Sequence, residues 1–134
     1  MDNIHELVII GSGPGGYACA FRAADLGINV TLIEMDSSLG GVCLNKGCIP
    51  SKAFLHIAKV LNEAKAISEV GVKFDAPSLN IKKINQWKND IVNNLGSGIE
   101  SLAKRRKVRI INGEASFNSA AELLIKSKSG KQKI

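Results

Sequence analysis

The sequence predicts an α/β fold, a Rossmann-like βαβ unit with a parallel sheet. The first observation is an apolar run, ELVII at 6–10, that ends at a glycine-rich turn. The second is an amphipathic helix pattern after that turn, and the third is another apolar run, INVTLI at 28–33. Continuous apolar runs are typical of buried parallel strands, and a strand, a helix and a strand in this order make a right-handed parallel crossover.

The first helix is predicted from apolar residues that repeat every three to four positions. These residues are Tyr17, Ala20, Phe21 and Ala24. Gly27 stands where a helix stop is expected. Cys19 falls at a position compatible with the core, so we expect it to be a buried, inert thiol.

Two further helices are predicted, followed by short strands. The helix after residue 52 has its apolar positions at Phe54, Ile57, Ala58, Leu61 and Ala64, and the connection 71–80 follows it. The longer helix, about 81–104, has them at Ile84, Trp87, Ile91, Leu95 and Leu102. Gly96 and Gly98 lie inside this helix and predict a bend or a close backbone contact. Strands are expected at 107–112, about 114–117 and 122–126, with a turn at Ser129 and Gly130 and only the beginning of a last strand.

Composition excludes several classes of function. The 134 residues are enough for one domain, and 45% of them are apolar. We expect no membrane-spanning segment, because no apolar run is long enough, and no targeting leader before Glu6. The net charge of +6 includes a basic run at 104–109, but no aromatic residues interleave with it, so we expect a solvated helix end and no nucleic-acid partner. Three cysteines are too few for a secreted disulfide framework, which predicts a cytoplasmic protein.

A glycine motif between the first strand and helix predicts a dinucleotide site. The motif consists of Gly11, Ser12, Gly13, Pro14, Gly15 and Gly16. In this pattern the first glycine permits the tight turn, the second lets a pyrophosphate approach the backbone and the third lets helix and strand pack closely. Glu34 ends the second predicted strand and is expected to accept hydrogen bonds from ribose hydroxyls.

The segment GGVCLNKGCIPSK at 40–52 places Cys43 and Cys48 five residues apart. So short a loop makes a weak structural staple, and the chain lacks a second close ligand pair for zinc, so no metal site is predicted. Reversible thiol–disulfide chemistry remains. A regular helix would separate the two Cα atoms by about 8.6 Å, more than a disulfide tolerates, so we expect a distortion at Gly47 and a helix that begins at Cys48.

A dinucleotide cradle beside a redox-capable cysteine pair indicates a flavin next to a disulfide. GGVCLNKGCIPSK closely resembles the redox-active segment of the FAD-dependent pyridine nucleotide-disulfide oxidoreductases, and INQWKNDIVNNL and AKRRKVRIINGEASF are also similar to bacterial members. The LNxGCIPSK form looks most like the members that oxidise protein-bound dihydrolipoyl groups. The resemblance implies FAD, NAD+ as co-substrate, a homodimer, and the dihydrolipoyl acyltransferase core of 2-oxo acid dehydrogenase complexes as partner. Members that reduce glutathione or mercuric ion are the alternative.

The resemblance also implies roles for individual residues. Cys43 would exchange with the dithiol substrate, and Cys48 would lie against the flavin as the charge-transfer thiolate, with Lys52 beside the isoalloxazine ring. Cys48 is therefore expected to be the less accessible thiol. The remaining cofactor contacts would come from Met35, Gly40, Gly41, Val42 and the backbone at Ala115. Val42 is often threonine in the family, so a hydroxyl contact is lost here, and Lys46 is expected to face solvent.

The resemblance implies that residues 1–134 are the N-terminal part of an FAD-binding domain, without the NAD-binding and dimer-interface domains. We therefore expect an incomplete parallel sheet and a chain that is catalytically inert alone. A nonenzymatic FAD-binding or assembly module is the alternative from a different class.

Overall fold

The structure is a computed structural model that describes residues 5–134. The expectation about a leader before Glu6 falls mainly on residues 1–4, outside the described part. In chain order the elements are β1 Leu7–Ile10, α1 Pro14–Asp25, β2 Val30–Glu34, α2 Gly41–Asn45, α3 Cys48–Ala66, the 3₁₀ helix η1 Ile67–Val70, α4 Ile81–Arg105, β3 Arg109–Asn112, β4 Glu114–Ser119, β5 Glu122–Ser127 and β6 Gly130–Lys133.

The predicted parallel sheet is confirmed, with strand order β1-β2-β3. Leu7 pairs with Val30, and Thr31 pairs with Arg109. β2 is central, and all five of its residues are buried. Because side chains alternate along a strand, Leu32 and Ile33 face opposite sides of the sheet, and each belongs to a separate apolar cluster.

Each face of this sheet is covered by a different layer. On one face, Leu32 packs with Ala20 of α1 and Ala103 of α4. On the other face, Ile33 packs with Leu123 and Ile125 of a second sheet, which is antiparallel with order β4-β5-β6. The last strand, expected to be only begun, spans four residues and pairs with β5, with Ser127 opposite Gly130.

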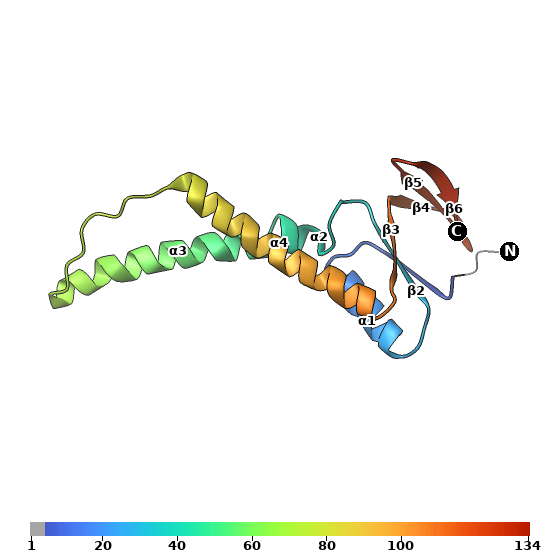
Figure 1. The fold of residues 1–134 in the computed structure, drawn as a ribbon, viewed down its shortest axis with the longest axis horizontal. Coiled ribbons are helices and arrows are strands. Elements are labelled where there is room, and N and C mark those ends of the chain that lie inside the picture. Colours follow the sequence, from blue (N-terminus) through green and yellow to red (C-terminus); the bar gives the residue numbers. More distant parts are fainter. Residues whose placement is uncertain (1–4) are drawn as a thin grey trace.

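Helices α3 and α4 extend from the sheets as a long arm (Figure 1). Both predicted helices are confirmed, and the basic residues Lys104 and Arg105 occupy the last turn of α4 as expected. Gly96 is buried, but a Cβ there would make only an ordinary contact, 3.7 Å from a methyl of Leu44, and a Cβ at Gly98 would meet nothing within 4 Å, so neither glycine makes the predicted close backbone contact. Only Ala53 of α3 is buried, and residues 65–83 are all exposed.

Three further details differ from the sequence-based expectations. Cys19 is exposed, so the prediction of a buried thiol was wrong: Ala20 and Ala23 carry the buried side of α1. The third parallel strand begins at Arg109, later than predicted, because Lys107 takes a left-handed turn with φ of 56°. The short helix α2 was not predicted.

Within residues 5–134, no helix combines the length and apolar character needed to cross a bilayer.

Candidate functional site

The turn after β1 has the geometry predicted for its glycines. Gly11 has φ of +90° and donates its N–H to the Ile33 carbonyl at 2.8 Å. A Cβ on Gly16 would lie 1.9 Å from the Gly11 carbonyl oxygen, so only glycine fits there. Helix α1 starts at Pro14, and no side chain caps its N-terminus at Gly13. The first N–H groups of α1 are therefore available to an anion.

A second glycine pair, Gly40 and Gly41, packs directly on this turn. Both adopt positive φ, +106° and +62°. The Gly40 N–H donates to the carbonyl of Ser12 at 3.0 Å and to its hydroxyl at 3.2 Å. A Cβ on Gly41 would lie 2.7 Å from the Gly13 Cα. The structure thus brings the glycine motif and the start of the cysteine segment into contact, although the sequence indicated them as two separate signals.

Glu34 anchors the same turn from β2. It is 6% exposed, and its Oε2 accepts from the Ser12 N–H at 2.8 Å and from the Ser12 hydroxyl, while Oε1 accepts from the Asp36 N–H at 2.8 Å. Burial raises the pKa of this carboxyl, but the hydrogen bonds from Ser12, Asp36 and Met35 outweigh burial and lower the pKa overall. Glu34 is therefore an ionised acceptor. A carboxylate has about four acceptor positions, and these four hydrogen bonds occupy them, so a ribose hydroxyl would share or replace one of these donors.

A cavity of about 570 Å³ opens beside Glu34 and is also lined by Glu100, Lys104 and Asn112. The Asn112 side chain donates to the Glu34 carbonyl at 3.1 Å and to the Asp36 carbonyl at 2.5 Å. Asn112 thereby fixes the loop that leaves β2, a role that the sequence analysis missed because it depends on the pairing of β2 with β3. This cavity is a candidate place for the nucleoside end of a dinucleotide.

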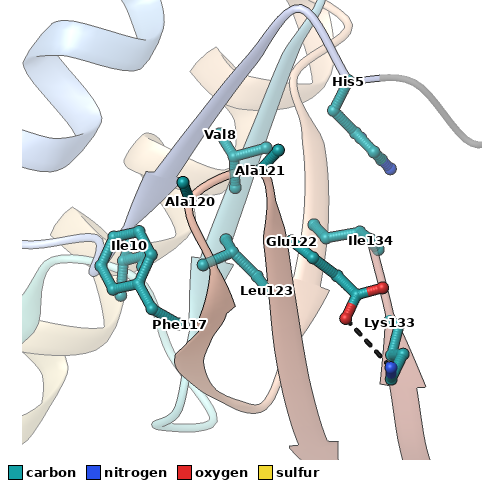
Figure 2. A pocket seen from close by; sticks show the side chains of 10 residues that line it. All are labelled: His5, Val8, Ile10, Phe117, Ala120, Ala121, Glu122, Leu123, Lys133 and Ile134. Atoms are coloured by element: carbon teal, nitrogen blue, oxygen red, sulfur yellow. Dashed lines mark ion pairs between the residues drawn. The ribbon is translucent and has the colours of Figure 1, made fainter.

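The other predicted residues lie around these elements. Ala115 is the second residue of β4, and it packs against the Ile33 cluster. Met35 is 70% exposed and Val42 67% exposed. A separate cavity of about 480 Å³ is lined by His5, by Val8 and Ile10 of β1 and by residues of the β4–β6 region, and it contains none of the predicted site residues (Figure 2).

The cysteine segment is distorted where the sequence predicted it. Cys43 lies on α2, and Cys48 is the first residue of α3. Between them Gly47, with φ of −120° and ψ of −99°, breaks the helical path. Hydrogen bonding with the Cys48 thiol, with burial as a further cause, raises the pKa of Cys43.

The exposure of the two cysteines differs from the expectation. Both are free thiols; Cys48 is exposed and Cys43 is half-buried, so the predicted order of accessibility was wrong for this chain. Cys48 opens α3, a helix whose residues are mostly solvent-exposed, whereas Cys43 lies on α2, which packs on the glycine turn.

Two lysines flank the pair. Lys52 is exposed on α3, four residues after Cys48. Lys46 has a 62% exposed side chain, as predicted, and its Nζ lies 3.1 Å from an Asp36 carboxylate oxygen. Among residues 5–134, no group of three or more His, Cys, Asp or Glu side chains is arranged to hold a metal ion.

Comparison with known proteins decides the family. The family described as pyridine nucleotide-disulphide oxidoreductase matches residues 5–132. The chain belongs to this family.

Several curated relatives of this family member are named dihydrolipoyl dehydrogenase. The protein of Buchnera aphidicola subsp. Schizaphis graminum is 54% identical over 123 residues, which cover 92% of this chain and 26% of the relative. The protein of Vibrio cholerae is 47% identical over 126 residues, 94% of this chain and 26% of the relative. That of Staphylococcus aureus is 49% identical over 112 residues, 84% of this chain and 24% of the relative. The chain thus spans about a quarter of the length of these relatives.

Proposed function

We propose that the chain is the cysteine-bearing part of a flavin-dependent dihydrolipoyl dehydrogenase. The observation that carries this proposal is the contact between the glycine turn and the cysteine segment, made by Gly40 on Ser12 and by Gly41 on Gly13. This contact puts a candidate phosphate cradle next to a pair of neighbouring thiols. The dihydrolipoyl dehydrogenases that share about half of the aligned residues support this substrate class.

The described residues fit FAD as the implied cofactor. The uncapped N-terminus of α1 offers N–H groups to the pyrophosphate, and Gly13 and Gly41 let it approach the backbone. Ionised Glu34 would accept from the ribose, and its charge disfavours a ligand with a 2′-phosphate. Bound FAD supplies an acceptor for an electron pair from sulfur, and NAD+ is the proposed final acceptor.

The chemistry of the cysteine pair itself is thiol–disulfide exchange. In the oxidised form, one thiolate of the dihydrolipoyl group attacks the Cys43 sulfur, and the Cys43–Cys48 bond breaks to release the Cys48 thiolate. The second substrate thiolate then attacks the mixed disulfide and releases Cys43. The substrate leaves as a cyclic disulfide, having lost two electrons and two protons, and the protein disulfide has gained the two electrons.

We further propose a homodimer that serves the acyltransferase core of 2-oxo acid dehydrogenase complexes, as the named relatives suggest. We place it in the cytoplasm because three cysteines are too few for a secreted disulfide framework. The test is an assay of the full-length protein encoded by the reading frame that contains these residues. We expect turnover of dihydrolipoamide with NAD+, abolished by Cys43→Ser and by Cys48→Ser but retained in Cys19→Ser. Activity confined to glutathione disulfide or Hg(II) would assign the protein to another branch, and FAD binding without any turnover would favour an assembly module.

A further inference from the structure

Asn45 has a hydrogen-bond arrangement that the proposed function does not explain. It ends α2, two residues after Cys43, and is half-buried. Its side-chain nitrogen donates to the Leu39 carbonyl at 3.1 Å and to the Gly41 carbonyl at 3.0 Å, and its oxygen accepts from the Ser38 hydroxyl at 3.2 Å. Both N–H donors of the amide are therefore used, and all three partners belong to residues 38–41.

The segment 38–41 is in turn fixed to the glycine turn. Gly40 donates its N–H to Ser12, and the Ser12 hydroxyl donates to the Glu34 carboxylate. A continuous series of hydrogen bonds thus runs from Glu34 through Ser12 and Gly40 to the segment that Asn45 holds. Asn45 connects the helix that carries Cys43 to a buried polar part of the molecule.

Helix α2 needs such an anchor because it has only five residues. A helix this short does not hold its own conformation in water. Leu44 is its one buried residue, and its side chain packs against Gly40 and Gly96. An apolar contact is not directional, so Leu44 alone leaves the rotation of the turn weakly determined.

We infer that Asn45 is a positioning residue for the cysteine pair: its hydrogen bonds with Ser38 and Leu39, both outside α2, fix the rotation of α2 and thereby the direction of the Cys43 side chain relative to Cys48. This inference rests on the proposed redox role of the pair. It assigns to Asn45 a contribution to the disulfide equilibrium, separate from any contribution to folding. Removing the amide donors should therefore weaken the bridge even where the fold is retained.

The test is thiol–disulfide exchange of the purified chain with glutathione disulfide. One glutathione disulfide accepts two electrons from the Cys43 and Cys48 thiols, giving a bridged chain and two glutathione thiols. Asn45→Asp keeps the side-chain shape but replaces the amide nitrogen by an oxygen, which cannot donate to the Leu39 and Gly41 carbonyls. The matched control is Asn94→Asp, at an exposed position of α4. We expect the equilibrium constant for bridging to fall about tenfold in Asn45→Asp and to stay unchanged in the control.

Two further measurements separate the outcomes. Far-UV circular dichroism reports whether Asn45→Asp is folded. If it is not, Ser38→Ala replaces it, because this change removes one hydrogen bond to Asn45 without altering α2. We expect Ser38→Ala to lower the equilibrium constant for bridging about threefold. In a Cys48→Ser background, Cys43 should form its mixed disulfide with glutathione equally well with and without the Asn45→Asp change, because no intramolecular geometry is involved. Equal bridging in the folded parent and variants would overturn the inference. Absence of a bridge in the parent would instead contradict the proposed function.

Discussion

Replacing Gly16 by alanine tests whether the glycine turn and α1 are packed as closely as the structure shows. A Cβ at this position would lie 1.9 Å from the Gly11 carbonyl oxygen and 3.0 Å from its carbon. Both are backbone atoms, so no side chain can rotate away, and α1 and the turn must separate. Overpacking of this kind costs about 1–3 kcal/mol, and we expect Gly16→Ala near the upper end, about 3 kcal/mol.

Gly15→Ala is the matched control for this experiment. Nothing lies within 4 Å of a Cβ at Gly15, which is also in α1. Alanine is the better helix former, so this change should stabilise the chain by up to about 1 kcal/mol. Urea unfolding followed by far-UV circular dichroism gives both free energies of unfolding. Equal values for the two variants would refute the close packing of α1 on the turn.

Three other predictions concern reactivity, pH and cofactor binding. Limiting iodoacetamide should modify Cys48 of the reduced chain before Cys43, because Cys48 is exposed and hydrogen bonding with Cys48 raises the pKa of Cys43. Peptide mass mapping reports the order, and labelling of Cys43 first would contradict the observed arrangement. Because the pKa of Glu34 is lowered in the folded state, its stabilising effect is complete above the ordinary value of 4.5 and is lost as the pH falls through the lower folded pKa. Glu34→Gln should therefore flatten the acid side of the stability profile, whereas Glu69→Gln, at an exposed site, should leave it unchanged. The 134-residue chain alone should lose FAD on gel filtration and show no dihydrolipoamide:NAD+ turnover; stoichiometric flavin with turnover would show that the chemistry requires fewer parts than we propose.

The local features of this fold were predictable because neighbouring residues determine them. The apolar runs, the glycine motif and the helix start at Cys48 each depend on a short stretch of sequence. The burial of Cys19 was predicted wrongly because small residues occupy several faces of α1, so periodicity alone does not show which of them meets the sheet. Accessibility of Cys43 and Cys48 likewise depends on packing between segments.

The parts of the site that escaped prediction all involve contacts between distant segments. Ser12 was assigned only to the glycine motif, yet it links Glu34 to Gly40. Asn45 was not assigned a role from the sequence, yet its amide binds Ser38 and Leu39 in the segment before α2. Their partners become visible only when β1, β2 and α2 meet. No short-range pattern in the sequence encodes these pairings.

Reversible bridging of Cys43 and Cys48 is the central claim, and peptide mapping of the oxidised chain tests it most directly. Trypsin cleaves after Arg22, Lys46 and Lys52, so the two cysteines fall in separate peptides, 23–46 and 47–52. After mild oxidation and digestion without reductant, we predict one species that joins these two peptides, and its disappearance when dihydrolipoamide is added first. A bridge to the peptide that contains Cys19, or two unlinked peptides after oxidation, would contradict this claim.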